Sequence, residues 1–148
     1  MFHRYRVETD LATVCKEFGI GLTTFSPLYY GILTGKYNEG IPKGTRADRD
    51  GYGWVRERIT PERIAIVDML TALARDLGLT TAQLAIAWAI GHPAVTVSLV
   101  GVRNATELNE NVRAVGWQLT TEIRAEIDLA FAAEGVPTYA DRPDLQAK

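Results

Sequence analysis

The sequence predicts an α/β fold with two parallel strands, flanking helices and one long loop. Three observations carry this prediction. Apolar residues recur with helical spacing in five segments, two short β-compatible runs interrupt them, and a stretch rich in Gly and charge follows the first run. The length of 148 residues, 47% of them apolar, is that of one ordinary domain that buries a core without disulfides.

The first helix is predicted to begin after Thr9 or Asp10, either of which can cap it, and to end at Gly19. Its apolar positions have the spacing of a buried stripe: Leu11, Val14, Cys15 and Phe18. Cys15 is therefore expected to be a small buried side chain. Residues 20–25 follow as a short buried strand, and Pro27 ends its pairing.

A long loop is predicted over residues 28–60. So long an unstructured stretch in a compact domain is usually functional or mobile, so function is expected there first. Trp54 lies in this loop, where it either packs as part of a lid or forms a wall on the substrate side.

Two helices and a second strand follow the loop. Pro61 suits the first turn of a helix that ends near Gly78, and Thr80 or Thr81 caps a very apolar helix in which Trp88 is expected in the core. The buried stripe of the first of these helices is Ile66, Leu70, Leu73 and Leu77. Residues 95–101 are apolar enough for a strand that is covered on both faces.

The last two helices are predicted from their caps and stripes. Asn104 caps the first, and Thr120 or Thr121 caps the second. Their apolar stripes are Leu108, Val112 and Val115, and Ile123, Ile127 and Phe131. Residues 135–148 are expected to be a loose tail.

Composition excludes several classes of function. The net charge of −2 provides no basic field for nucleic acid, and one cysteine with two distant histidines provides neither an internal disulfide nor a metal site. The longest apolar run, residues 84–90, is shorter than the roughly 20 residues of a membrane helix. The first residues lack the apolar core of a signal peptide, so a cytoplasmic location is expected.

Two parallel strands form a marginal sheet by themselves. The sequence therefore reads as a slice of a larger parallel sheet. The open sheet edges lead us to expect self-association, complementation by an N-terminal fragment, or a start codon placed too late.

Two motifs connect the chain to a known family. FSPLYYGILTGKY (residues 25–37) and LVGVRNATELNENV (residues 99–112) resemble the C-terminal part of aldo-keto reductases, nearest the branch of the voltage-gated potassium-channel β-subunits and their bacterial relatives. The likeness extends from Met1 to about Phe131 and implies that residues 1–134 are the cofactor-binding portion of a (β/α)8 TIM barrel, with the two strands as the seventh and eighth.

The resemblance implies an NADP site on these motifs. It places Ser26, Pro27, Leu28, Tyr29, Tyr30 and Gly31 beside the diphosphate and nicotinamide ribose, and Lys36 near the phosphates. From the residues alone, the same segment is a strand end with a Ser-Pro turn and a solvated lysine. Arg46 matches a belt that crosses the diphosphate in the relatives; by itself it reads as a solvated loop charge.

The second motif supplies the adenosine side of the implied site. Arg103 suits the 2′-phosphate of NADP, and Gly101 belongs to the same implied set. Glu107 fits either adenosine recognition or a capping box with Asn104. Glu110 and Asn111 match adenine contacts, although Asn111 also fits an exposed helix position.

The implied function is the NADP-binding C-terminal portion of an oxidoreductase that reduces aldehydes or ketones when complete. The family's catalytic aspartate, tyrosine, lysine and histidine belong to earlier strands, so no catalytic residue is expected in this chain, and a small carbonyl substrate is a partner only if the barrel is completed. Two alternatives remain: a nicotinamide-sensing regulatory module without turnover, and an inactive truncated product.

Overall fold

The computed structural model describes residues 1–4 and 7–135. In chain order the elements are η1 (Val7–Leu11), α1 (Ala12–Glu17), β1 (Leu22–Phe25), η2 (Tyr29–Thr34), η3 (Arg46–Asp48), α2 (Gly53–Arg56), α3 (Pro61–Asp76), α4 (Thr81–Ile90), β2 (Val95–Leu99), α5 (Ala105–Val112) and α6 (Thr121–Ala133). The predicted tail begins at Gly135, and its residues 136–148 lie outside the described part.

The two strands form a parallel pair, as predicted. Leu22 is in register with Val95 and Phe25 with Leu99, and the register shifts between Leu22 and Thr23. The Thr24 hydroxyl donates a hydrogen bond of 3.0 Å to the Ser98 hydroxyl across the pair. This pairing brings the ends of two segments about 70 positions apart in the sequence to the same edge of the sheet.

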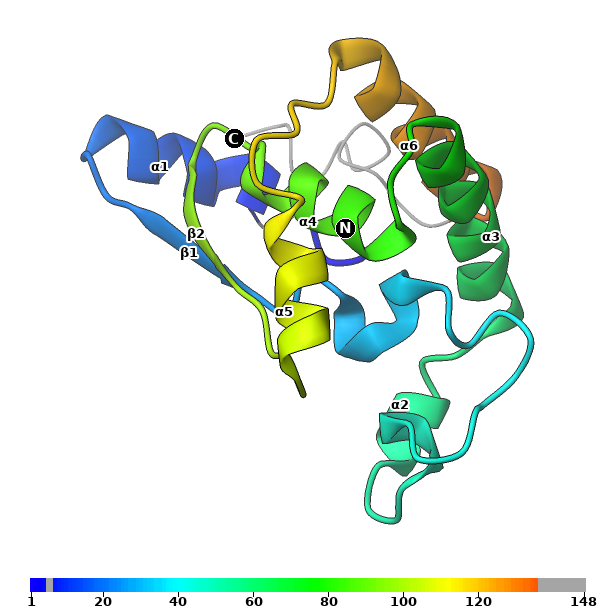
Figure 1. Ribbon diagram of the computed structural model, residues 1–148. Coiled ribbons are helices and arrows are strands. Elements are labelled where there is room, and N and C mark those ends of the chain that lie inside the picture. The colour runs from blue at the N-terminus through cyan, green and yellow to red at the C-terminus, as the bar shows by residue number, and fades with distance from the viewer. Residues whose placement is uncertain (5–6, 136–148) are drawn as a thin grey trace.

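The core lies around α4, which packs against β2 on one side and α3 on the other (Figure 1). α4 is buried from Thr81 to Ala89 because almost every position is small or apolar. It begins at a capping box in which the Thr80 hydroxyl accepts from the Gln83 N–H and the Gln83 side chain accepts from the Thr80 N–H. Trp88 and Ile127, predicted core residues, are buried in this core.

The helices after the loop begin where the sequence predicts. Thr60 caps α3 at the Arg63 N–H with Pro61 as its first residue, and Thr120 caps α6 at the Ile123 N–H. α3 buries Ile66 and Leu70 of its predicted stripe. Its later buried position is Ala74, while Leu73 and Leu77 are half-buried.

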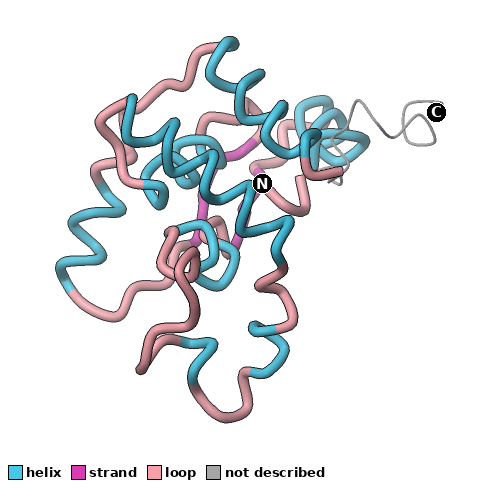
Figure 2. The backbone as a smooth tube through the Cα atoms, turned by 90° about the vertical axis from the view of Figure 1, so that its right-hand side faces the viewer, coloured by secondary structure: helices cyan, strands magenta, loops and turns pink. Residues whose placement is uncertain are grey.

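The long loop is more ordered than predicted. Residues 28–60 carry η2, η3 and α2, and five of their apolar residues are almost fully buried: Ile32, Leu33, Tyr37, Ala47 and Val55. The Arg56 guanidinium donates to the Ala47 and Asp48 carbonyls and fastens α2 to η3. The loop therefore folds as a small unit that projects beside the helical body (Figure 2).

The first helix differs from its prediction. A π-helical turn, η1, precedes α1, so helical structure starts before Thr9 and Asp10, and the residue at the start of α1, Leu11, makes no side-chain cap. Cys15 is buried as expected. The other members of the stripe, Leu11, Val14 and Phe18, are exposed.

The predictions that both strands and the α5 stripe are buried are wrong. Phe25 is 76% exposed and Leu99 is 57% exposed, and β2 ends at Leu99 instead of residue 101. The α5 stripe, Leu108, Val112 and Val115, is exposed as well. In the part of the chain that the structure describes, no third strand pairs with β1 or β2, so both edges of the strand pair are open as well.

Candidate functional site

A cavity of about 420 Å³ lies at the carboxyl ends of the two strands, and we call it the strand-end cleft. Twelve of the thirteen residues predicted to bind cofactor line it: Ser26, Pro27, Leu28, Tyr30, Gly31, Lys36, Arg46, Gly101, Arg103, Glu107, Glu110 and Asn111. They come from the segment after β1, from η3, and from the segment after β2 that continues into α5. Parallel pairing explains this meeting, since both strands end at one edge.

Tyr29 is the predicted residue that lies elsewhere. Its side chain is buried in the core, where its ring centroid is 4.9 Å from that of Phe2. It also lines a second cavity. The structure therefore gives Tyr29 a packing role and places it outside the strand-end cleft.

The backbone after β1 is held in an unusual conformation. Ser26, Tyr29 and Tyr30 have positive φ angles of 53°, 46° and 61°, and Gly31 follows with 94°. Non-glycine residues rarely adopt this region, and such residues cluster at functional sites. Two backbone hydrogen bonds of 2.9 Å, from Tyr29 N–H to the Ser26 carbonyl and from Gly31 N–H to the Leu28 carbonyl, fix the turn.

Gly31 makes room for Lys36. A Cβ built on Gly31 would come within 2.6 Å of the Lys36 Nζ. Burial lowers the pKa of the Lys36 ammonium, and the nearby charges of Arg103 and Arg46 lower it further. The lysine is thus partly withdrawn from water and faces other cations, an arrangement that a bound anion would stabilise.

Charge in the strand-end cleft is mainly positive. Among the described residues, four cationic side chains line it, Lys36, Arg46, Arg49 and Arg103, together with Glu107 and Glu110. The chain as a whole carries a net charge of −2, so these cations are concentrated locally. Clefts lined by one sign of charge raise the local concentration of oppositely charged ligands.

Arg103 and Glu107 form an ion pair at the mouth of α5. Glu107 Oε1 accepts from the Arg103 Nε at 2.9 Å and from its Nη2 at 2.6 Å, while Oε2 accepts from the Arg103 backbone N–H at 2.9 Å. Asn104 caps the helix by accepting from the Glu107 N–H at 2.9 Å. The capping box is therefore altered, because Glu107 reaches back to Arg103 instead of Asn104.

Helix α5 is tied to the core at the same place. The Gln83 side-chain amide donates a hydrogen bond of 3.0 Å to the Glu110 carbonyl. Gln83 also belongs to the capping box of α4. One buried glutamine thus fixes the cleft wall that carries Glu110 and Asn111 relative to the core.

Six cleft residues were missed by the sequence analysis: Thr34, Arg49, Tyr52, Thr80, Ala82 and Val100. Thr80 and Ala82 belong to the start of α4, which the sequence predicts as a helix but does not connect to the cleft. Arg49 and Tyr52 lie in the charged loop. The Gly- and charge-rich composition of that loop was the available signal for them.

Trp54 packs edge-on against Tyr30 with ring centroids 4.8 Å apart, and the Arg58 guanidinium lies 5.1 Å from the centroid of the Trp54 ring.

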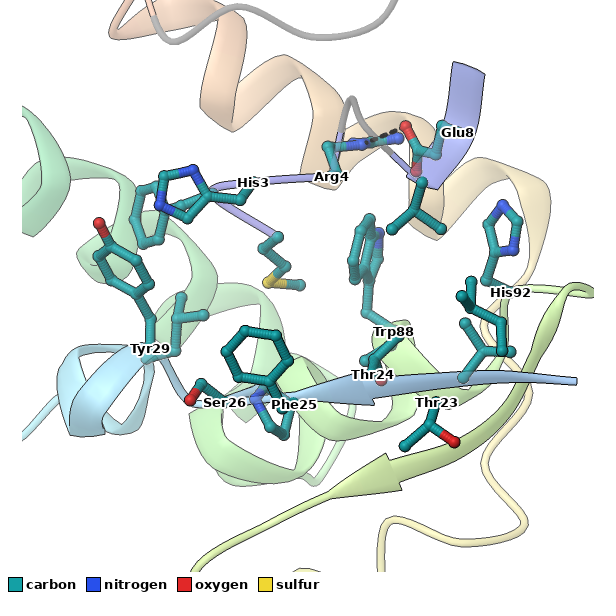
Figure 3. Close-up of a pocket in the computed structure, with 18 of the residues that line it drawn as sticks. His3, Arg4, Glu8, Thr23, Thr24, Phe25, Ser26, Tyr29, Trp88 and His92 are labelled. Carbon is teal, nitrogen blue, oxygen red and sulfur yellow. Dashed lines mark hydrogen bonds and ion pairs between the residues drawn. The ribbon is translucent and has the colours of Figure 1, made fainter. Parts of the chain in front are cut away.

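A second cavity of about 350 Å³ lies between β1 and the N-terminal segment (Figure 3). Its lining is mainly apolar, and Trp88 stands between β1 and Arg4, whose guanidinium is 4.9 Å from the Trp88 ring. Arg4 also pairs with Glu8 at 2.7 Å and with Asp128. These contacts hold the N-terminal segment onto α4 and α6.

Neither a metal centre nor a bilayer-spanning helix is found within residues 1–4 and 7–135. In these ranges no three His, Cys, Asp or Glu side chains are grouped so that they could hold a metal ion. The helices there are all too short or too polar to cross a bilayer.

The fold and the cleft define an open parallel α/β sheet with a cationic cavity at its strand ends. The profile of the Aldo/keto reductase family matches residues 1–131, and the chain belongs to that family.

Two relatives share much of the chain. A protein of Arabidopsis thaliana named probable voltage-gated potassium channel subunit beta is 41% identical over 117 residues, covering 78% of this chain and 36% of that protein. A protein of Schizosaccharomyces pombe named putative voltage-gated potassium channel subunit beta is 38% identical over 130 residues, covering 84% and 38%. The chain therefore spans less than two fifths of the length of these relatives.

A solved structure confirms the fold class. The glycerol dehydrogenase of Gluconobacter oxydans matches with a TM-score of 0.72 and 22% identity, covering 90% of this chain and 40% of that chain. The two parallel strands with their flanking helices are thus an open portion of an aldo-keto reductase (β/α)8 barrel.

Proposed function

We propose that this chain carries the nicotinamide-dinucleotide site of an aldo-keto reductase-type oxidoreductase and that its cofactor is NADP(H). The observation that carries the proposal is the convergence of twelve predicted residues, from segments on both strands, on one cationic cleft. The diphosphate of a dinucleotide is bound by cationic side chains together with hydrogen-bond donors, and this cleft offers both.

The residues present fit such a ligand. Lys36 is half-buried beside Gly31, where the absence of a side chain leaves room for the lysine ammonium. Ser26 adds a hydroxyl to the same wall. Arg103 at the start of α5 suits the extra phosphate that distinguishes NADP from NAD. A bound nicotinamide would supply hydride, and this chain's residues would hold and orient it.

Reduction of aldehydes or ketones is proposed for the complete barrel. The resemblance assigns the family's catalytic aspartate, tyrosine, lysine and histidine to earlier strands, so we expect this chain to bind nucleotide without reducing a carbonyl. A small carbonyl substrate and a cytoplasmic location belong to the same proposal.

A second candidate function rests on the two relatives, which are named as potassium channel β-subunits. In that case the chain would bind a nicotinamide cofactor and report its redox state without turnover. The two functions differ in whether a complete protein containing this chain consumes NADPH in the presence of a carbonyl compound.

Equilibrium titration of the purified 148-residue chain with NADPH, followed by nucleotide fluorescence, tests the binding. The proposal expects saturable binding that weakens as salt is added, because the cleft acts on phosphates through charge. Absence of saturable binding to both NADPH and NADH contradicts it. Steady carbonyl reduction by the chain alone would contradict the expected lack of turnover.

A further inference from the structure

The Arg103 guanidinium is already paired with a carboxylate of this chain, that of Glu107. Two of its donors, on Nε and Nη2, face Oε1 of Glu107, and the Arg103 backbone N–H binds Oε2. The carboxylate is held by three hydrogen bonds and by the helix turn that Asn104 caps. Glu107 therefore occupies the edge of the guanidinium that would otherwise be free to grip a phosphate.

A phosphate monoester and a carboxylate compete for the same donors. A 2′-phosphate carries a charge of about −1.5 to −2 at neutral pH, so it must either displace Glu107 or lie against it. A ribose with free 2′- and 3′-hydroxyls meets the opposite situation. Its hydroxyl groups donate hydrogen bonds, and an ionised carboxylate accepts them.

We infer that Glu107 is a specificity-determining residue, an internal competitor for Arg103 that weakens the preference for NADP(H) over NAD(H). This inference rests on the proposed nucleotide site and adds a determinant to it. The hydrogen bonds from Arg103 keep the pKa of the Glu107 carboxyl below its usual range. The competitor is therefore charged at neutral pH. Lys36 faces the same cleft and attracts phosphate independently.

The test compares the ratio of the NADH and NADPH dissociation constants in the 148-residue chain and its variants. Glu107→Gln keeps the size of the side chain and an acceptor oxygen for the Arg103 N–H while removing the charge. We expect the ratio to rise about tenfold in favour of NADPH, the size of one charge-assisted contact. Glu126→Gln, on an exposed face of α6 away from the cleft, is the matched control and should leave the ratio unchanged.

A double-mutant cycle with Arg103→Met separates competition from general repulsion. If Glu107 acts by occupying Arg103, most of the gain from Glu107→Gln disappears when Arg103 is absent. A gain that persists in the Arg103→Met background overturns the competitor account. Thermal melts of all variants establish that each is folded, and Arg103→Met alone should weaken NADPH binding more than NADH binding.

The outcomes distinguish a failure of the inference about Glu107 from a failure of the proposed nucleotide-binding function. Binding of both nucleotides with an unchanged ratio in Glu107→Gln overturns the inference and leaves the nucleotide site standing. No binding of either nucleotide by the unmodified chain overturns the proposed function, and the inference with it.

Discussion

Gly31 and Lys36 are matched to each other: the lysine ammonium occupies the space that a side chain at position 31 would fill, 2.6 Å from the Cβ that alanine would add. Gly31 also has a backbone φ of +94°, a value that L-residues with a side chain rarely adopt. The strained turn after β1 and the half-buried charge of Lys36 are therefore parts of one arrangement.

Gly31→Ala is predicted to damage both parts of this arrangement. The strained φ should lower the free energy of unfolding by about 1–2 kcal/mol. Displacement of Lys36 should weaken NADPH binding as well. Urea denaturation and fluorescence titration measure the two effects. Gly44→Ala is the matched control because its φ is +77° but nothing lies within 4 Å of the added Cβ. It should lose stability and keep its affinity, and an equal loss of affinity in both variants would contradict the role given to Lys36.

Lys36→Met is predicted to raise the Kd for NADPH about tenfold and to make binding less sensitive to salt, because one charge-assisted contact to phosphate is lost. Lys43→Met provides the comparison, since Lys43 is exposed in the same loop and does not line the cleft. Titrations at two salt concentrations measure both quantities. Equal behaviour of the two variants would remove Lys36 from the site.

Val55→Ala is predicted to lower the free energy of unfolding by about 2 kcal/mol, because Val55 is fully buried and anchors the loop that contains α2. Val115→Ala, at a position 69% exposed, should change it by less than about 0.5 kcal/mol. Urea denaturation compares them. If residues 28–60 were an unstructured loop, Val55→Ala would be as harmless as its control.

Self-association is predicted from the open strand pair. Phe25, at the end of β1, is largely exposed, and an uncovered apolar strand edge favours pairing between chains. Sedimentation velocity over a range of concentrations should show oligomers that Phe25→Lys reduces. Leu129→Lys, on the exposed face of α6, should leave them in place. A sharp monomer at all concentrations, with cooperative melting, would refute this prediction.

The sequence predicts the elements of the fold well where local signals act alone. Thr60, Thr80, Asn104 and Thr120 cap helices as expected, because a side-chain oxygen near the first turn satisfies free N–H groups wherever the helix packs. The parallel pairing of the two strands is confirmed for a similar reason, since a helical connection between strands favours it.

Predictions that depend on which other element of the chain packs against a residue are less successful. The stripes of α1 and α5 have the correct spacing, but spacing cannot say whether another element covers them, and the described chain leaves Val14 and Val112 exposed. The altered capping box at Glu107 was missed because the sequence shows which acceptor is available but not that the Arg103 N–H competes with that of Asn104. Tyr29 lies beside cleft residues in the sequence, yet its side chain is buried in the core, and the turn that carries it has positive φ angles.

The central claim is that the segments after β1 and β2 are two walls of one nucleotide site. Backbone amide NMR of the isotope-labelled 148-residue chain, titrated with NADPH, tests it most directly. We expect saturable shifts at Ser26, Gly31 and Lys36 on one wall and at Gly101, Arg103 and Asn111 on the other, with one dissociation constant for both. Shifts confined to one wall, or located only around the cavity between β1 and the N-terminal segment, would contradict the claim.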